Sequence, residues 1–373
     1  MHVLFLFTYD LSLKKWKDGK LLSREIKIYQ ELAEKYDIKF TFLTYGNESD
    51  YAIVENRNIN VIPIYDSLKY SKNKFVRFMR SFKIPFYINK LDINPTLIKT
   101  NQLNGVWVAI IYKIITGKPI YVRTGYDLLQ FKIKQKKFLQ SIFFYFLTQF
   151  SLIFANVYSV TSNTDKKFLS KFYLLNQNKV SLRPNWVIPP THINPLQNRK
   201  KDTVFSVGRL EMQKNYINLI QSLSGSTIKL DIVGKGNQEN KLKKLAEMNN
   251  LSCNFMGSID FNKLMNLYSN YKIFVTTTLY EGNPKTILEA MANGCIVVAP
   301  NIPNINEVIE SGVNGIIFDP KKDNLLEIVE GLFKNEDIMD FISNNAYNYI
   351  KNNYSLSNYI KDEFLVYKNL INS

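Results

Sequence analysis

Short runs of β-branched and aromatic residues alternate along the chain with segments of helical periodicity. Residues 2–9 (HVLFLFTY) and 38–45 (IKFTFLTY) have the composition of buried strands, and residues 24–36 between them have the spacing of a helix. The same order of strand, helix and strand follows at 95–101, 107–115 and 119–125. Strands that alternate with helices are typical of a parallel sheet covered by helices on both faces. The first half is therefore predicted to be a doubly wound α/β domain.

The second half repeats this pattern, with short apolar runs separated by helical segments, and residues 184–202 between the halves have no periodicity and are rich in Pro, Asn and charge. We therefore expect an N-terminal Rossmann-like domain at 1–190, a second at 191–355, and a C-terminal helix at 356–373 that packs toward the first domain. The two sheets would face a central cleft, because open α/β sheets bind ligands at the carboxyl ends of their strands.

Length and cysteine content agree with this picture. The 373 residues exceed what one hydrophobic core usually supports. Only two cysteines are present, both in apolar stretches, so we predict neither a disulfide framework nor a zinc site. The N-terminal MHVLFLF is too short for a signal sequence and has no basic leader. These features predict a protein of the reducing cytoplasm.

The net charge of +16 lies entirely in the first half of the chain. Residues 1–190 hold 29 Lys and Arg against 13 Asp and Glu, whereas residues 191–373 hold 19 of each. A basic half beside a neutral half indicates an anionic partner, such as a membrane surface, nucleic acid or a phosphorylated acceptor.

One basic segment, residues 68–91, has no acidic residue and contains the helical pattern KFVRFMRSFK. Its aromatic stripe and flanking cations suit the interface of an anionic bilayer. The residues expected to contact a membrane are Lys74, Phe75, Arg77, Phe78 and Phe82. The alternative is a helix that packs on its own domain with a solvated basic rim.

A second segment, residues 138–160, carries no charge and is long enough to span a bilayer. Polar residues interrupt it and its end has the pattern of a strand, so a helix of about 15 residues followed by a strand is favoured over a transmembrane span. Whether residues 138–150 touch the membrane is left open.

Candidate chemistry begins in the second half with FSVGRLEMQKN, where a strand ends at Gly208 and is followed by Arg209 and Lys214. Two cations at the carboxyl end of a strand suit a phosphate or diphosphate, although a solvated loop is the alternative. Gly234 and Gly236 lie at another strand end, where glycine permits the backbone to approach a nucleotide closely.

The stretch YEGNPKTILEAMANG has the pattern of a helix that begins at a proline. Asn283 is predicted to be its N-cap and Pro284 its first residue, so that the amides of Lys285 and Thr286 form an anion site. Glu281 precedes the helix, and Glu289 would lie about 7.5 Å along its axis from the proline. The two carboxylates could bind hydroxyls on either side of a phosphate; capping and dipole compensation are the alternative for Glu281.

These motifs resemble the family 4 retaining glycosyltransferases of GT-B fold, the glycosyl transferases group 1. The resemblance rests on GRLEMQKN, IVGKGNQ, FMGSID, the segment from YEGNPKTILEAMANG to GIIFDP, and the tail YSLSNYIKDEFLVYKNLI, in the family's order over nearly all of residues 200–373. The first half resembles the family more loosely, through KTNQLNGVW, PIYVRTGYDL, SVTSNTDKKFL and RPNWV.

The resemblance implies a role for each matching residue. Arg209 and Lys214 would neutralise the departing diphosphate of a nucleotide sugar, Glu281 would lie beside the hydroxyls of the donor sugar, and Glu289 would accept hydrogen bonds from the ribose. The remaining donor-binding positions would be Gly208, Gly234, Gly236, Gly257, Gly282, Asn283, Pro284, Lys285 and Thr286. Such enzymes need no metal, the chain contains no D-x-D motif, and no cofactor is expected.

The sequence departs from the family in its first domain. Many members carry a histidine where this chain has Gly125, Tyr126 and Asp127, and the glycine pair that often follows the first strand is reduced to Gly19. Gly19, Tyr126 and Asp127 are therefore candidate contacts to the sugar or the acceptor, with a merely packed loop as the alternative for the last two.

The function expected from all this is a metal-independent, retaining hexosyltransferase that transfers a sugar from a nucleotide-diphosphate sugar to a lipid-linked or surface-polysaccharide acceptor. It would serve the synthesis of lipopolysaccharide or capsule at the inner face of the cell membrane, peripherally bound to the anionic surface and with no nucleic acid partner. The alternatives are a nucleotide-sugar epimerase or hydrolase of the same fold, and a non-catalytic basic protein that binds nucleic acid or membranes.

Overall fold

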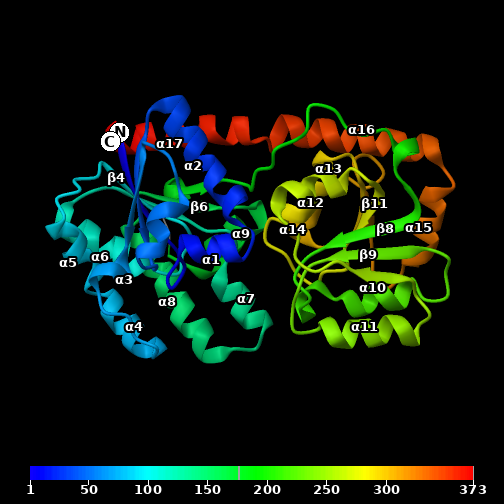
Figure 1. Cartoon of the computed structure of the whole chain (residues 1–373), viewed down its shortest axis with the longest axis horizontal. Helices are drawn as coiled ribbons and strands as arrows, with labels where there is room; N and C mark the ends of the chain where they lie inside the picture. The colour runs from blue at the N-terminus through cyan, green and yellow to red at the C-terminus, as the bar shows by residue number, and fades with distance from the viewer. Residues whose placement is uncertain (175–176, 373) are drawn as a thin grey trace. The chain divides into compact units, whose positions relative to one another are not determined.

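Two α/β units make up the chain in the computed structural model, which describes residues 1–174 and 177–372 (Figure 1). The first unit comprises Met1–Pro184 and Ile360–Ser373, and the second comprises Asn185–Tyr359. The boundary between the units lies after Pro184, a few residues before the predicted boundary near residue 190. The segment from Ile360 onward belongs to the first unit again.

The first unit is built on a seven-stranded sheet, counted over the described residues, in the order β3-β2-β1-β4-β5-β6-β7. Every pairing in it is parallel. The strands are β1 His2–Leu6, β2 Lys39–Thr44, β3 Ile59–Pro63, β4 Leu97–Thr100, β5 Ile120–Arg123, β6 Val157–Val160 and β7 Val180–Leu182.

Helices connect these strands and flank the sheet (Figure 1). They are α1 Leu13–Asp18, α2 Leu22–Tyr36, α3 Ile64–Ser67, α4 Lys74–Ser81, α5 Ile84–Lys90, α6 Val106–Thr116, α7 Leu128–Lys134, α8 Phe138–Phe154 and α9 Asn163–Phe172. The helix of 17 residues at α8, followed by strand β6, confirms the prediction for residues 138–160.

The second unit contains a six-stranded parallel sheet in the order β10-β9-β8-β11-β12-β13. Its strands are β8 Lys200–Val207, β9 Lys229–Val233, β10 Cys253–Phe255, β11 Tyr271–Val275, β12 Ile296–Pro300 and β13 Ile316–Phe318. Its helices are α10 Tyr216–Ser222, α11 Glu239–Met248, α12 Phe261–Tyr268, α13 Lys285–Ala292, α14 Pro303–Asn306, α15 Leu325–Phe333 and α16 Glu336–Asn353, and α17 Leu356–Asn372 ends the chain.

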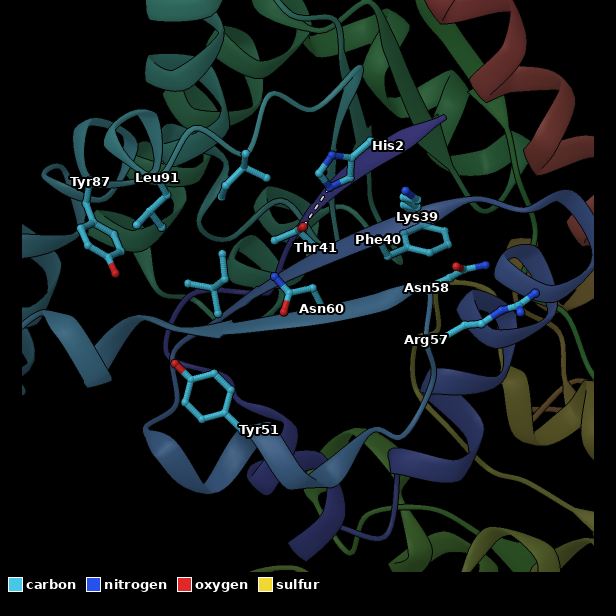
Figure 2. A pocket seen from close by; sticks show the side chains of 12 residues that line it. His2, Lys39, Phe40, Thr41, Tyr51, Arg57, Asn58, Asn60, Tyr87 and Leu91 are labelled. Atoms are coloured by element: carbon cyan, nitrogen blue, oxygen red, sulfur yellow. Dashed lines mark hydrogen bonds between the residues drawn. The ribbon is translucent and has the colours of Figure 1, made fainter.

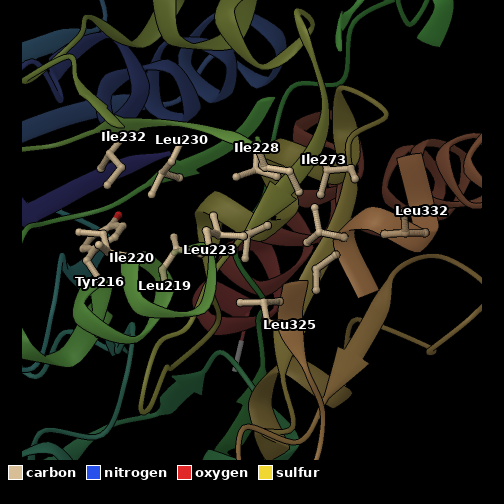
Figure 3. Close-up of a cluster of buried hydrophobic side chains, with 14 of the residues drawn as sticks. Tyr216, Leu219, Ile220, Leu223, Ile228, Leu230, Ile232, Ile273, Leu325 and Leu332 are labelled. Carbon is tan, nitrogen blue, oxygen red and sulfur yellow. The ribbon is translucent and has the colours of Figure 1, made fainter. Parts of the chain in front are cut away.

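Successive strand residues of the second sheet enter two different cores, as the period of two in a strand requires. Val204 and Ile273 pack with α10, α11 and α15, and Figure 3 shows this cluster around Leu219 and Leu230. The neighbouring Phe205 and its partners pack instead with α12 and α13. Strands buried on both faces explain the continuous apolar runs of the sequence.

Candidate functional site

The carboxyl ends of β8, β9 and β10 bring the predicted donor glycines together. The amide of Gly208 donates to the carbonyl of Val233 (3.0 Å), and the amide of Gly234 donates to the carbonyl of Gly257 (2.9 Å). Gly234 has a φ of +151°, and a Cβ on it would lie 1.9 Å from the carbonyl oxygen of Gly208. Only glycine permits this approach, so the loops form a close-packed backbone platform.

Gly236 completes this platform, since a Cβ there would lie 2.3 Å from the carbonyl oxygen of Leu210. Gly282, on the loop before α13, is buried. The predicted donor glycines therefore all lie in loops at the carboxyl ends of the strands of the second sheet.

The two predicted phosphate-binding cations differ in how they are held. Arg209 has a side chain that is 69% exposed and lies 3.3 Å from a carboxylate oxygen of Glu211. Lys214, in the 3₁₀ turn Met212–Lys214, is largely buried and forms an ion pair with Glu281. Arg209 is thus largely open to solvent, whereas Lys214 is held against a carboxylate.

Hydrogen bonds between two loops explain why Lys214 meets Glu281. The amide of Leu279 donates to the carbonyl of Gln213 (2.8 Å), and the side-chain amide of Gln213 donates to the carbonyl of Tyr280 (2.8 Å). These bonds join the loop after β8 to the loop after β11 directly beside the ion pair. The sequence analysis gave both charged residues a role but missed their pairing, because no local pattern links positions 67 residues apart.

Helix α13 begins one residue later than predicted, at Lys285, with Pro284 as its N-cap. Asn283 does not cap the helix, because its side-chain oxygen accepts a hydrogen bond from the amide of Asn185 (2.9 Å). The prediction of Asn283 as N-cap and Pro284 as first helical residue was therefore wrong. The first turn, Lys285 with the half-buried Thr286, still presents the positive end of the helix dipole beside Glu281.

Sequence reasoning also missed the residues that hold this helix start in place. The side-chain amide of Asn185 donates to the carbonyl of Asn283 (2.8 Å), in addition to the bond just described. The ammonium of Lys285 lies 4.1 Å from the ring centroid of the buried Trp186. Asn185 and Trp186 belong to the RPNWV motif, which the sequence analysis noted as a resemblance but to which it assigned no role.

Glu289 lies on the buried side of α13 and is only 1% exposed. The hydroxyl of Tyr268 donates to its carboxylate over 3.3 Å. Burial, together with this carboxylate, raises the pKa of Tyr268 well above its usual value. The predicted contact of Glu289 with a ribose stays a prediction, since the carboxylate offers almost no surface in this structure.

The first-unit candidates occupy different environments. Gly19 is exposed at the C-terminus of α1, and Tyr126 is exposed with its ring 4.4 Å from that of Phe131. Asp127 is buried and is the N-cap of α7, where its carboxylate accepts from the amide of Gln130 (2.7 Å). Burial raises the pKa of Asp127 to about 7. Capping thus accounts for Asp127, and sugar or acceptor contacts of these three residues stay predictions.

The predicted membrane-facing helix α4 is only partly exposed. Lys74 and Phe75 lie on the surface, but Phe78 and Phe82 pack against Trp107 with ring centroids 5.2 and 6.2 Å away. Arg77 is buried, and its guanidinium binds the carboxylate of Asp10 (2.8 Å). We therefore remove Arg77 from the predicted membrane contact.

A hollow of about 540 Å³ lies near the amino ends of β1 and β2. Figure 2 shows the side chains that line it, among them His2, of which a ring nitrogen lies 2.8 Å from the hydroxyl of Thr41. Tyr51 and Tyr87 also line it. Burial lowers the pKa of His2. None of the predicted site residues lines this hollow, and ligands of parallel sheets bind at the opposite, carboxyl ends of the strands.

The described part of the chain contains neither a membrane-spanning helix nor a cluster of metal-ligating side chains. In residues 1–174 and 177–372, no helix combines the length and the apolar character needed to cross a bilayer. Within the same ranges, no three His, Cys, Asp or Glu side chains are grouped so that they could hold a metal ion.

Comparison with known proteins agrees with the resemblance found in the motifs. Residues 190–349 match the family model described as glycosyl transferases group 1. An uncharacterized glycosyltransferase of Methanocaldococcus jannaschii is 31% identical over 46% of this chain and 46% of its own length. The O-antigen chain mannosyltransferase RfbU of Salmonella typhimurium is 27% identical over 50% of this chain and 53% of its own. The chain thus spans about half the length of these curated relatives.

Similarity to solved structures covers almost the whole chain. Sucrose-phosphate synthase from Thermosynechococcus elongatus matches with a TM-score of 0.81 at 15% identity, over 99% of both chains. HepE of Anabaena, solved in complex with UDP, matches with a TM-score of 0.75 at 17% identity, over 99% of this chain and 100% of its own. At such low identity these matches show the fold alone, which is GT-B as predicted.

Proposed function

We propose that this chain, whose residues 190–349 belong to the glycosyl transferases group 1 family, transfers a sugar from a nucleotide-diphosphate sugar to a lipid-linked or surface-polysaccharide acceptor. Two similar proteins support this proposal: RfbU is an O-antigen chain mannosyltransferase, and HepE, which has the same fold, was solved in complex with UDP. The cytoplasmic face of the cell membrane is the location that we propose for this reaction.

The observation that carries the proposal is the Lys214–Glu281 ion pair beside the start of α13. A nucleotide sugar presents a diphosphate next to sugar hydroxyls, so it needs a cation and a hydrogen-bond acceptor side by side. Lys214 supplies the first and Glu281 the second, and the first-turn amides of α13 supply further donors for the phosphates.

In the proposed reaction, negative charge grows on the diphosphate as the bond between the sugar and the phosphate breaks. Lys214 and Arg209 stabilise that charge, and because Lys214 is already fixed by Glu281, little reorganisation is needed as the charge develops. These cations are the reason why we propose a metal-independent reaction. Retention of the anomeric configuration, which the resemblance implies, is part of the proposal, and the coupling constant of the product's anomeric proton checks it.

Binding of the donor is tested by thermal unfolding against a panel of nucleotide sugars. A ligand present at 100 times its dissociation constant stabilises the folded state by about 2.7 kcal/mol. We expect one nucleotide sugar to raise the Tm of the wild type. If none of them does so, the proposal is wrong.

Sugar transfer from that donor is then compared between the wild type and Glu281→Gln. The substitution removes the charge that pairs with Lys214 and weakens contact with the sugar hydroxyls, so transfer should fall by about 10²–10³-fold. Glu247→Gln, an exposed glutamate of α11 in the same unit, is the matched control and should transfer at the wild-type rate. Release of free sugar without transfer would identify a hydrolase instead.

A further inference from the structure

Helix α8 turns its apolar side outward. Its exposed large side chains, between 41% and 80% accessible, form one stripe, here termed the α8 face, which consists of Phe138, Leu139, Ile142, Phe143, Phe146, Phe150 and Ile153. Its buried side carries only two large apolar residues, Leu147 and Leu152, beside three hydroxyl residues, Ser141, Thr148 and Ser151. The hydroxyl of Ser141 donates to the carbonyl of the N-cap Lys137, and that of Ser151 donates to the carbonyl of Leu147. A helix that covers a core and faces water turns its larger apolar stripe inward, whereas the larger apolar stripe of α8 is exposed.

Neighbouring helices extend this apolar surface. A groove of about 440 Å³ between α7 and α8 is lined mainly by apolar side chains, among them Leu129, Ile133 and Phe138, together with Lys136 and Lys137. On the α4 side, Phe78 packs against Phe143 with ring centroids 6.3 Å apart, and the exposed Phe75 and Met79 follow. Figure 1 shows α4, α7 and α8 on the same side of the first unit.

The charge around the α8 face has one sign. No Asp or Glu occurs between residues 128 and 164, and four lysines, at 132, 134, 136 and 137, immediately precede α8. Lys136 and Lys137 are exposed and line the groove beside the apolar side chains. An apolar stripe with lysines at its edge complements a surface that is hydrocarbon inside and anionic outside.

We propose that the α8 face lies in the interface of an anionic bilayer, with its phenylalanine and leucine side chains among the lipid chains and Lys136 and Lys137 at the phosphate groups. Protein interfaces are depleted in lysine, so the lysine edge favours a lipid surface over a protein partner or a second copy. This inference deepens the proposed function, on whose membrane-bound acceptor it rests, and moves the main membrane contact from α4 to α8.

The experiment is flotation of the protein with vesicles of phosphatidylcholine alone and of phosphatidylcholine with phosphatidylglycerol. We expect the wild type to float with the anionic vesicles and much less with the neutral ones. Leu139→Glu/Phe150→Glu places two charges in the α8 face and should reduce flotation at least tenfold. Lys136→Gln/Lys137→Gln should weaken binding about fivefold per lysine, an effect that added salt removes.

Met248→Glu/Phe341→Glu is the matched control, because both side chains are exposed but lie in the second unit. It should float like the wild type. Circular dichroism checks that each variant is folded, and Leu139→Gln/Phe150→Gln serves in place of the glutamate pair if that pair is not. Nucleotide-sugar stabilisation, measured without vesicles, should persist in all variants and separates a failure of this inference from a failure of the proposed function.

Three results would overturn the inference. The first is equal flotation of the wild type and the α8 variant, and the second is no preference of the wild type for anionic vesicles. The third is a wild type that is dimeric without lipid while the α8 variant is monomeric, since a second copy would then cover the face.

Discussion

Lys214 and Glu281 show what single residues contribute at this site. The sequence analysis recognised both as candidates from their motifs, and the structure adds that each restrains the other. The structure also changes the interpretation of two further residues. Arg77 is a buried partner of Asp10 and not a surface cation, and Glu289 is enclosed by the protein. The charge of each side chain follows from the sequence, whereas its exposure to solvent depends on the tertiary structure.

Asp127 gives a prediction at this scale. Its carboxyl group ionises with a pKa of about 7 in the folded protein and near 3.9 in an unfolded chain. Because the folded protein holds this proton more tightly than the unfolded chain does, the protonated carboxyl group adds to the free energy of unfolding. This contribution is fully present below the unfolded pKa and is lost as the pH rises through the folded pKa of about 7. Asp127→Asn keeps the capping oxygen and removes the ionisation. Its stability advantage over the wild type should grow by about 2–3 kcal/mol between pH 5 and pH 8.

Urea unfolding of both proteins at the two pH values measures this difference. Asp260→Asn makes the same change at the N-cap of α12 and controls for the effect of the substitution on capping. An advantage that is the same at pH 5 and pH 8 would contradict the assignment.

At the scale of elements, the start of α13 depends on a segment distant in sequence. Proline and the apolar spacing predicted the helix correctly to within one residue. The loop before it, however, is held by Asn185, which forms two hydrogen bonds with Asn283, and by Trp186 beneath Lys285. The residues that follow the first unit thereby fix the position of the proposed donor site.

We predict that Asn185→Ala weakens donor binding more than it weakens the fold. The substitution removes the side-chain hydrogen bond to the carbonyl of Asn283 and keeps the bond that the backbone amide donates. This loss costs about 1–1.5 kcal/mol, which corresponds to roughly a tenfold rise in the KM for the nucleotide sugar with a smaller change in kcat. Asn194→Ala is the matched control. Asn194 lies in the same linker as Asn185, and its side-chain amide donates a hydrogen bond to the carbonyl of Ser269. Equal effects of the two variants on KM would show that Asn185 has no positioning role.

At the scale of the whole molecule, the last helix completes a unit formed mainly by the first 184 residues. Glu363 of α17 and Lys99 of β4 form an ion pair, and both are fully buried. Arg183 and the hydroxyl of Tyr121 also bind the Glu363 carboxylate, each at 3.1 Å. Burial lowers the pKa of Lys99, so the carboxylate is needed to keep that ammonium charged.

Glu363→Ala should therefore destabilise the first unit by about 3–5 kcal/mol, because it leaves the Lys99 charge buried without its partner carboxylate. Asp362→Ala, on the same helix, removes an exposed partner of the same Arg183 and should cost roughly 0–1 kcal/mol. Hydrogen exchange measured by mass spectrometry distinguishes the units. Faster exchange in β1 and β4 but not in β8 and β9 is the expected result, and uniform protection throughout would contradict it.

The sequence by itself determined the alternation of strands and helices, the two sheets, the strand-end glycines and the motifs that resemble the glycosyl transferases group 1, because hydrophobic periodicity and short motifs are local properties of the chain. Only the tertiary structure decided that Lys214 pairs with Glu281, that Asn283 binds Asn185 and not its own helix, and that α8 faces outward with its phenylalanines. Each of these depends on which distant segments the sheets bring together, and local patterns carry no information about that.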